Sequence, residues 1–172
     1  MKLLEFVLQD WSRNPRNAKG RIVLIMFRLA NLAALAPVYI KPIAYPYAIL
    51  YRILIEWVLG IELPWKLTIG KGLCLFHGQG TVINDHVRIG DYCIIRHNTT
   101  IGVSRTNFDF HGAAPVIGNS VDIGAGAIII GGITIGDHVK IAAGSVVVKN
   151  VPPCSTVAGN PAKVIRTESG LE

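Results

Sequence analysis

Five histidines are the side chains of this chain that are best suited to acid–base chemistry. They are His77, His86, His97, His111 and His138. A neutral imidazole can take a proton from a hydroxyl group near pH 7, which makes each of them a candidate general base. Which of them can act in that role depends on the elements that carry them.

The three cysteines, Cys74, Cys93 and Cys154, favour no such chemistry. They cannot all pair and they form no C-x-x-C motif, which argues against a disulfide scaffold and a zinc ribbon. Unpaired cysteines are typical of a reducing compartment, so we expect a cytoplasmic protein. The composition, 51% apolar and 16% charged, is typical of neither disorder nor nucleic-acid binding.

A six-residue repeat positions the histidines. From Ile69 onward an aliphatic residue recurs in six-residue steps, and a second small or aliphatic residue follows it four places later. The pairs are Ile69/Leu73, Ile83/Val87, Ile89/Cys93, Ile95/Thr99, Ile117/Val121, Ile123/Ala127, Ile129/Ile133, Ile135/Val139, Ile141/Ser145 and Val147/Val151. This period matches neither strand alternation nor a helix. It predicts coils with three flat faces, in which the paired residues point inward and the corners point outward.

Departures from the 18-residue coil mark insertions. Ile117 to Ile135 spans one regular coil, whereas the coil before Ile89 has two extra residues and the coil after it has ten. Insertions in a solenoid form loops, often on the working face. The shorter insertion contains His77, and the longer one, the loop 103–116, contains His111.

We therefore expect a mainly β protein in three parts. An N-terminal helical segment at 1–62 precedes a parallel β-helix of about four coils at 63–153. A short C-terminal tail at 154–172 follows Pro152 and Pro153, which are expected to stop the coils.

Helices are expected in the N-terminal segment at 22–36 and 47–59, after a first apolar face on residues 3–11. Pro37, Pro42 and Pro46 are expected to separate the last two, because proline disrupts helix interiors. The longest uncharged run there, twelve residues at 29–40, is too short to span a membrane. Charged residues near the start argue against a signal peptide.

The motifs in the coils are similar to those of one enzyme family. The runs 123–127 (IGAGA), 141–147 (IAAGSVV) and 158–163 (AGNPAK) resemble the serine acetyltransferase family of left-handed β-helix acyltransferases. The runs 76–84 and 95–97 look closest to members of the colanic-acid type in polysaccharide biosynthesis. The resemblance covers residues 60–166 and implies left-handed coils, which the periodicity alone does not show.

The resemblance also implies a homotrimer that binds acetyl-CoA as co-substrate in a groove between neighbouring prisms, without a metal. The positions that match this groove are Gly102, Val103, Ala125, Ala143 and Lys163. Small residues would let the pantetheine arm approach the backbone, and Lys163 could meet a phosphate group of CoA. Glycine and alanine are also expected there from corner geometry alone.

A catalytic pair, His77 and Glu62, is implied by the same resemblance. His77 stands at an outward position of an irregular coil, where the family has its catalytic histidine. Glu62 matches the carboxylate that orients this histidine, which is usually Asp in the family. A carboxylate on one ring nitrogen leaves the other nitrogen free as base. Backbone N–H groups near Gly102 and Val103 are the expected oxyanion donors.

The acceptor residues depart from the serine acetyltransferase pattern. That family has an Arg-His pair before the proline that ends the inserted loop, whereas residues 113–115 read Ala-Ala-Pro here. Phe76 replaces the acidic residue expected before His77. Both changes remove polar groups that would hold a zwitterion, so we expect a sugar hydroxyl as acceptor. His97 and His111 are the candidates for lining its site.

The N-terminal segment has two interpretations. Residues 1–60 contain eight basic residues against three acidic ones and supply most of the net charge of +6. In the interpretation that we favour, their apolar faces pack on the prism and on trimer mates. In the other, the apolar helices and the basic run 13–21 rest on an anionic membrane surface.

Three other functions compete with sugar O-acetylation. Serine O-acetylation is the direct rival. A zinc enzyme of the γ-carbonic-anhydrase type needs a closely spaced pair of histidines, and the five histidines offer none. A non-catalytic β-helix scaffold is the third alternative, against which the presence of His77 and Glu62 speaks.

Overall fold

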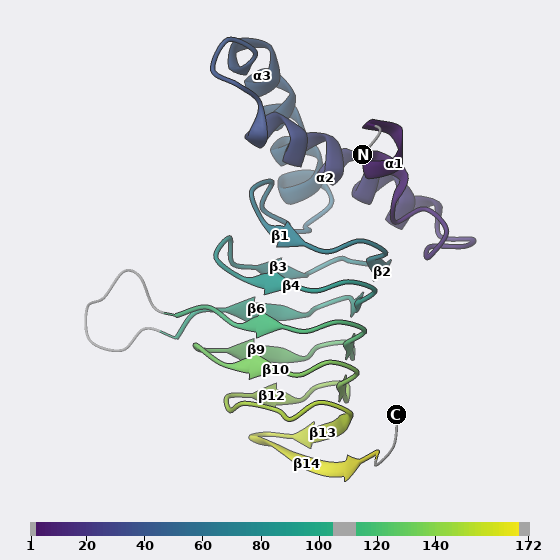
Figure 1. Ribbon diagram of the computed structural model, residues 1–172, viewed down its shortest axis with the longest axis vertical. Helices are drawn as coiled ribbons and strands as arrows, with labels where there is room; N and C mark the ends of the chain where they lie inside the picture. Colours follow the sequence, from purple (N-terminus) through teal and green to yellow (C-terminus); the bar gives the residue numbers. More distant parts are fainter. Residues whose placement is uncertain (1–2, 105–112, 169–172) are drawn as a thin grey trace.

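Three parallel sheets form the faces of a prism in the computed structural model, which describes residues 3–104 and 113–168 (Figure 1). The β1 sheet consists of β1 (Thr68–Ile69), β4 (Arg88–Ile89), β7 (Val116–Ile117) and β10 (Thr134–Ile135). The β3 sheet consists of β3 (Val82–Ile83), β6 (Thr100–Gly102), β9 (Ile128–Ile130) and β12 (Val146–Val147). The β2 sheet consists of β2 (Cys74–Phe76), β5 (Ile94–Arg96), β8 (Asp122–Ile123), β11 (Lys140–Ile141), β13 (Ser155–Gly159) and β14 (Ala162–Thr167).

The repeat explains this architecture. Each coil adds one strand to each sheet, and the leading aliphatic residues pair with their copies in the next coil, as Ile69 does with Ile89 and Ile89 with Ile117. All of these side chains are buried in one continuous core. The two insertions lie where the sequence places them, between β2 and β3 and between β6 and β7.

The expected end of the coils at residue 153 is too early. β13 pairs in parallel with β11, and its Val157 is buried opposite Ile141, so the chain continues the β2 sheet beyond the two prolines. Pro152 and Pro153 occupy a corner, where no ladder hydrogen bond requires their missing N–H groups. β14 then pairs antiparallel with β13 and covers the last strand of the parallel stack.

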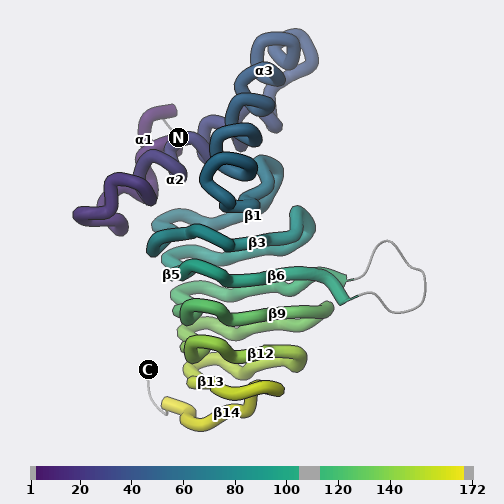
Figure 2. Tube along the Cα trace, turned by 180° about the vertical axis from the view of Figure 1, so that it is seen from behind, coloured from purple at the N-terminus to yellow at the C-terminus, as the bar shows by residue number. Residues whose placement is uncertain are grey.

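The helical segment lies at the other end of the prism (Figure 2). It consists of α1 (Leu3–Leu8), α2 (Ala18–Leu35), α3 (Lys41–Tyr51) and the π-helical turn η1 (Arg52–Val58). Asn17 caps α2 by accepting a hydrogen bond from the Gly20 N–H at 2.9 Å. Among the described helices, none combines the length and the apolar character that a membrane span requires.

The expected helix boundary at the prolines is wrong. α3 begins at Lys41, so Pro42 lies in its first turn and Pro46 lies in its interior. Pro42 is tolerated because the first N–H groups of a helix have no partner within it. Pro46 removes one intrahelical bond, and burial of the α3 side chains Ala48 and Tyr51 compensates for this loss.

A buried ion pair fastens the helical segment to the first coil. Arg28 Nε lies 2.8 Å from Asp10 Oδ2, and the two side chains are 1% and 2% exposed. The guanidinium also donates hydrogen bonds to the carbonyl groups of Ile69 and Gly70, while Asp10 Oδ1 accepts one from the Leu73 N–H. The sequence pattern did not indicate this role for Asp10.

Asn14 also pairs with backbone groups at this open edge of the β2 sheet. Its side-chain amide donates to the Leu73 carbonyl at 2.8 Å and accepts from the Leu75 N–H at 3.1 Å. An unpaired edge strand is a template for aggregation unless side chains or another element cover it. The helical segment therefore ends the β2 sheet with polar side chains in place of a further strand.

We expect Arg28→Ala to lower the free energy of unfolding by about 3–5 kcal/mol, because it leaves the Asp10 carboxylate buried without its partner. Arg52→Ala is the matched control, since Arg52 is 57% exposed in its pair with Glu56, and it should cost less than about 1 kcal/mol. Urea unfolding followed by circular dichroism measures both. Equal losses in the two variants would contradict the anchoring role of Arg28.

Candidate active site

His77 stands exposed at the corner where the β2 sheet turns into the β3 sheet. The two-residue insertion makes this corner tight: His77, Gly78 and Gly80 all have positive φ, at 66°, 65° and 67°. A Cβ on Gly78 would come within 3.1 Å of the side chains of Ile61 and Leu75, so this position favours glycine. The insertion therefore holds an imidazole at a fixed place on the prism surface.

One column of corner residues continues from this point along the prism. Backbone N–H groups link the coils there: Asn98 donates to Gln79, Gly126 to His97 and Gly144 to Ala125. The column thus consists of Gln79, His97, Ala125 and Ala143. The rings of His77 and His97 meet edge to face with centroids 5.9 Å apart, and Nδ1 of His97 is buried without a hydrogen-bond partner in the described residues.

Glu62 lies on the outer side of the β3 sheet, in an isolated bridge with Val82. Its N–H donates to the Thr81 carbonyl at 2.8 Å, and its carbonyl accepts from the Ile83 N–H at 3.0 Å. The side chain is exposed, and within the described ranges its carboxylate has no hydrogen bond to His77 or to any other group. The hydrogen-bonded pair with His77 stays a prediction.

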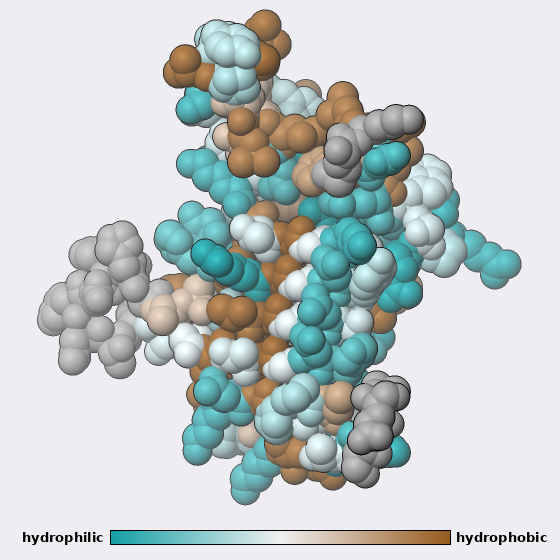
Figure 3. Space-filling view, in the orientation of Figure 1, coloured by the Kyte–Doolittle hydropathy of each residue, from teal (hydrophilic) through white to brown (hydrophobic). Residues whose placement is uncertain are grey.

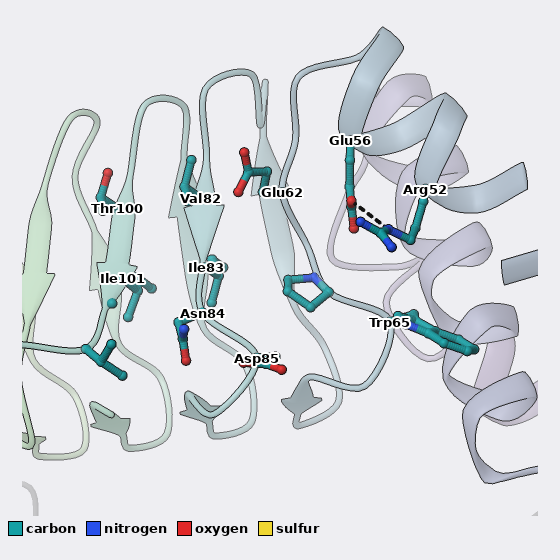
Figure 4. A pocket seen from close by; sticks show the side chains of 13 residues that line it. Arg52, Glu56, Glu62, Trp65, Val82, Ile83, Asn84, Asp85, Thr100 and Ile101 are labelled. Carbon is teal, nitrogen blue, oxygen red and sulfur yellow. Dashed lines mark hydrogen bonds and ion pairs between the residues drawn. The ribbon is translucent and has the colours of Figure 1, made fainter. Parts of the chain in front are cut away.

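A cavity of about 580 Å³ opens over the β3 sheet where the helical segment meets the prism (Figure 4). Its polar lining includes the carboxylates of Glu56, Glu62 and Asp85. Arg52 is the one cation among the described lining residues, and its Nε lies 3.1 Å from Glu56 Oε2. This carboxylate-lined pocket has a net negative charge, so it suits hydroxyl donors better than anions.

The sequence did not indicate this pocket. Its walls come from η1, from the turn at Trp65 and from the strand end at Asn84 and Asp85, which lie far apart in the chain. Only the docking of the helical segment on the prism brings them together. No motif in any one of these segments signals that arrangement.

Gly102 and Val103 line the far side of the same pocket, at the end of β6. A Cβ built on Gly102 would meet no atom of the described chain within 4 Å, so the space above this backbone is open. This observation fits the expectation that a ligand approaches Gly102 closely.

The five expected co-substrate positions do not form one continuous surface in a single chain. Gly102 and Val103 lie at the β6 end of the β3 sheet, whereas Ala125 and Ala143 lie in the corner column next to His77. Lys163 is exposed on β14, paired with Ala158 of β13. The corner column and Gly102 stand on opposite edges of the β3 sheet, separated by on the order of 10–15 Å of extended chain.

The other histidines and aspartates have no place in the proposed catalytic pair. His111 lies outside the described residues. His86 is exposed and faces Asp85 at 3.7 Å. Asp91 and Asp137 accept hydrogen bonds from backbone N–H groups one coil away, which gives them a structural role. In the ranges 3–104 and 113–168, no group of three potential ligands is placed to hold a metal ion.

Comparisons with known proteins agree with this fold. The family model "Bacterial transferase hexapeptide (six repeats)" matches residues 114–149. WcaB of Escherichia coli (strain K12), assigned by its name to colanic acid biosynthesis as an acetyltransferase, is 36% identical over 92% of this chain and 98% of its own length. A serine acetyltransferase of Synechococcus elongatus is 41% identical over 62% of this chain and 43% of its own length.

Solved structures support the same fold and the same family. Soybean serine acetyltransferase superposes with a TM-score of 0.79 at 30% identity, over 95% of this chain and 69% of that one. The serine acetyltransferase of Brucella abortus strain S19, solved with coenzyme A, gives 0.77 at 32% identity, over 98% and 67%. The chain belongs to the hexapeptide-repeat transferase family, which implies that its coils are left-handed. It is an acetyltransferase, and its relatives include both WcaB and serine acetyltransferases.

Cys93 should take no part in the chemistry. It is buried in the core, and burial raises the pKa of its thiol to about 11, so about one thiol in a thousand is ionised at pH 8. We expect iodoacetamide at pH 8 to modify the partly exposed Cys154 well before Cys93, as read by peptide mass spectrometry. Rapid alkylation of Cys93 in the folded protein would show that this core position is open.

Proposed function

We propose that this chain transfers the acetyl group of acetyl-CoA to a hydroxyl group of a sugar in polysaccharide biosynthesis. The carboxylate-lined pocket is the observation that carries the choice of acceptor. WcaB, which matches nearly end to end, supports the same assignment. The coenzyme A complex of the Brucella abortus enzyme supports the donor.

The proposed chemistry is direct transfer with His77 as general base. The imidazole takes the proton of the acceptor hydroxyl while the oxygen attacks the thioester carbon. The same imidazolium then donates this proton to the departing CoA sulfur, so that the base is regenerated. Glu62 would fix the ring in the working tautomer. Backbone N–H groups next to the open space at Gly102 would stabilise the charge on the carbonyl oxygen.

A homotrimer would complete this site. His77 and Gly102 occupy opposite edges of the β3 sheet, too far apart within one chain to act on one carbonyl group. Apolar side chains lie along the outer side of the β3 sheet, at Val82, Ile128, Ile130, Val146 and Val148, and are interrupted by Glu62 and Thr100. A neighbouring copy packed against this face would bring its own Gly102 edge to the His77 corner.

Serine O-acetylation is the second candidate, favoured by the serine acetyltransferases among the structural neighbours. The pocket carboxylates could hold the ammonium group of L-serine, but the guanidinium of Arg52, which would have to hold its carboxylate, is already paired with Glu56. Hydroxyl groups of a neutral sugar, in contrast, would donate hydrogen bonds to these carboxylates. The absence of a free cation for the serine carboxylate among the described lining residues therefore favours the sugar.

His77→Ala should lower kcat by about 10²–10⁴-fold, the range typical for loss of a general base. The matched control is His138→Ala, which removes another exposed corner histidine of the same prism and should keep the wild-type rate. Release of the CoA thiol in the presence of an acceptor measures both. Glu62→Gln should show a smaller loss than His77→Ala, and a wild-type rate for either would remove that residue from the mechanism.

An acceptor screen should separate the two candidate functions. With acetyl-CoA as donor, we expect sugars to accelerate thiol release and L-serine to leave it near the hydrolytic background. Asp85→Asn should raise KM for the sugar and leave KM for acetyl-CoA unchanged, because Asp85 lines the acceptor pocket. Turnover of L-serine at a rate above that of every sugar would assign the chain to serine O-acetylation.

A further inference from the structure

The helical segment exposes a broad apolar surface that the fold does not use. Brown side chains gather over this segment at the top of Figure 3. We call this surface the apolar ridge. It consists of Leu35, Val38, Tyr39, Ile40, Ile43, Tyr45, Ile49, Leu50, Ile53, Leu54, Trp57 and Val58, all of which are exposed. Ile43 and Trp57 are 79% and 77% exposed. Exposed patches of this kind mark interaction sites.

Within the chain, only one side of α3 and η1 packs against other residues. Ala48, Tyr51 and Ile55 are buried, and their spacing of three and four residues places them on one side of the helix. The expectation that the N-terminal apolar faces pack on the prism is confirmed for α2, which buries Phe27 and Arg28 against it. The outer sides of α3 and η1 do not pack on the prism, and their packing on trimer mates stays a prediction.

The distribution of the ridge indicates what covers it. A second helix buries a narrow seam, whereas the exposed apolar residues extend around α3 and η1 and over the connection 36–40 at their tip. A bilayer surface can accept apolar side chains from several sides at once. Tyr39, Tyr45 and Trp57 are of the types enriched at membrane interfaces.

Charge points to the same occupant. Within 35–58 the basic residues are Lys41 and Arg52, and the one acidic residue, Glu56, is paired with Arg52. Lys41 is half-buried at the tip, next to exposed apolar side chains. The basic run 13–21 lies at the other end of α2, against β2, and contributes its positive charge to the helical segment from there. Basic residues beside an interfacial helix favour anionic lipid.

We propose that the apolar ridge docks the protein on the surface of an anionic lipid bilayer, with α3 and η1 lying in the interface. η1 carries both part of the ridge and one wall of the carboxylate-lined pocket, through Arg52 and Glu56. Docking therefore places that pocket beside the lipid, within reach of a sugar carried on a lipid anchor. This last consequence rests on the proposed function, whereas the docking does not.

Vesicle flotation tests the docking without any activity measurement. The full-length protein should float with vesicles of phosphatidylcholine and phosphatidylglycerol at low salt, and much less with phosphatidylcholine alone. Ile43→Ser and Trp57→Ser should each reduce the bound fraction on the order of tenfold, because each removes an apolar side chain from the interface. Ile165→Ser is the matched control, since Ile165 is 64% exposed on β14 at the far end of the prism.

Each result decides for or against the proposal. Both ridge residues are exposed, so the variants should keep the wild-type unfolding midpoint, and each single variant is a separate test. Absence of flotation at low salt, or equal flotation of ridge variants and wild type, would overturn the proposal. If the ridge variants instead lower the molar mass in light scattering while no protein floats, the ridge contacts a second copy. Loss of flotation with sugar acetylation intact in solution would leave the proposed function standing.

Discussion

The parallel stacking of inward aliphatic residues is the constraint on which the rest of the structure depends. Each coil must return to its starting face one strand spacing further on, about 4.8 Å, so that Ile69, Ile89, Ile117 and Ile135 form a continuous column. This requirement leaves the corner residues no choice but to point outward. A ligand site on such a prism is therefore built from columns at its edges, and an insertion changes one point of a column without disturbing the others.

The stack of coils also has two open ends, and the chain covers each of them in a different way. At the last coil, β14 turns back as an antiparallel strand. At the first coil, polar side chains of the helical segment take the place of a strand, with Asp10, Asn14 and Arg28 bonded to the backbone of residues 69–75. This polar capping explains how three charged or amide side chains are buried in an otherwise apolar interface. Separate contacts hold η1 over the β3 sheet, where it forms a wall of the carboxylate-lined pocket: Ile55 is buried, and the Tyr51 hydroxyl donates to the Leu63 carbonyl at 2.7 Å.

The sequence predicts the part of this structure that repeats. The six-residue period, the two insertions and the exposed corner position of His77 follow from it, because they depend on contacts between equivalent residues of successive coils. The features that it did not predict depend on contacts between dissimilar segments. Pro46 lies within α3 because burial on α2 outweighs its local preference, and β13 continues beyond two prolines because a sheet edge was available. The pocket lined by Arg52 and Asp85 has no local signal at all.

The central functional claim is that one active site needs two copies of the chain, since His77 and Gly102 stand on opposite edges of one sheet. Mixing two inactive variants, His77→Ala and Gly102→Trp, in denaturant and refolding them together tests it most directly. If His77 of one copy works with the Gly102 edge of its neighbour, activity should return in the mixture, with about one quarter of the interfaces carrying both intact residues. A mixture that stays as inactive as its two components, while forming mixed oligomers, would contradict the account.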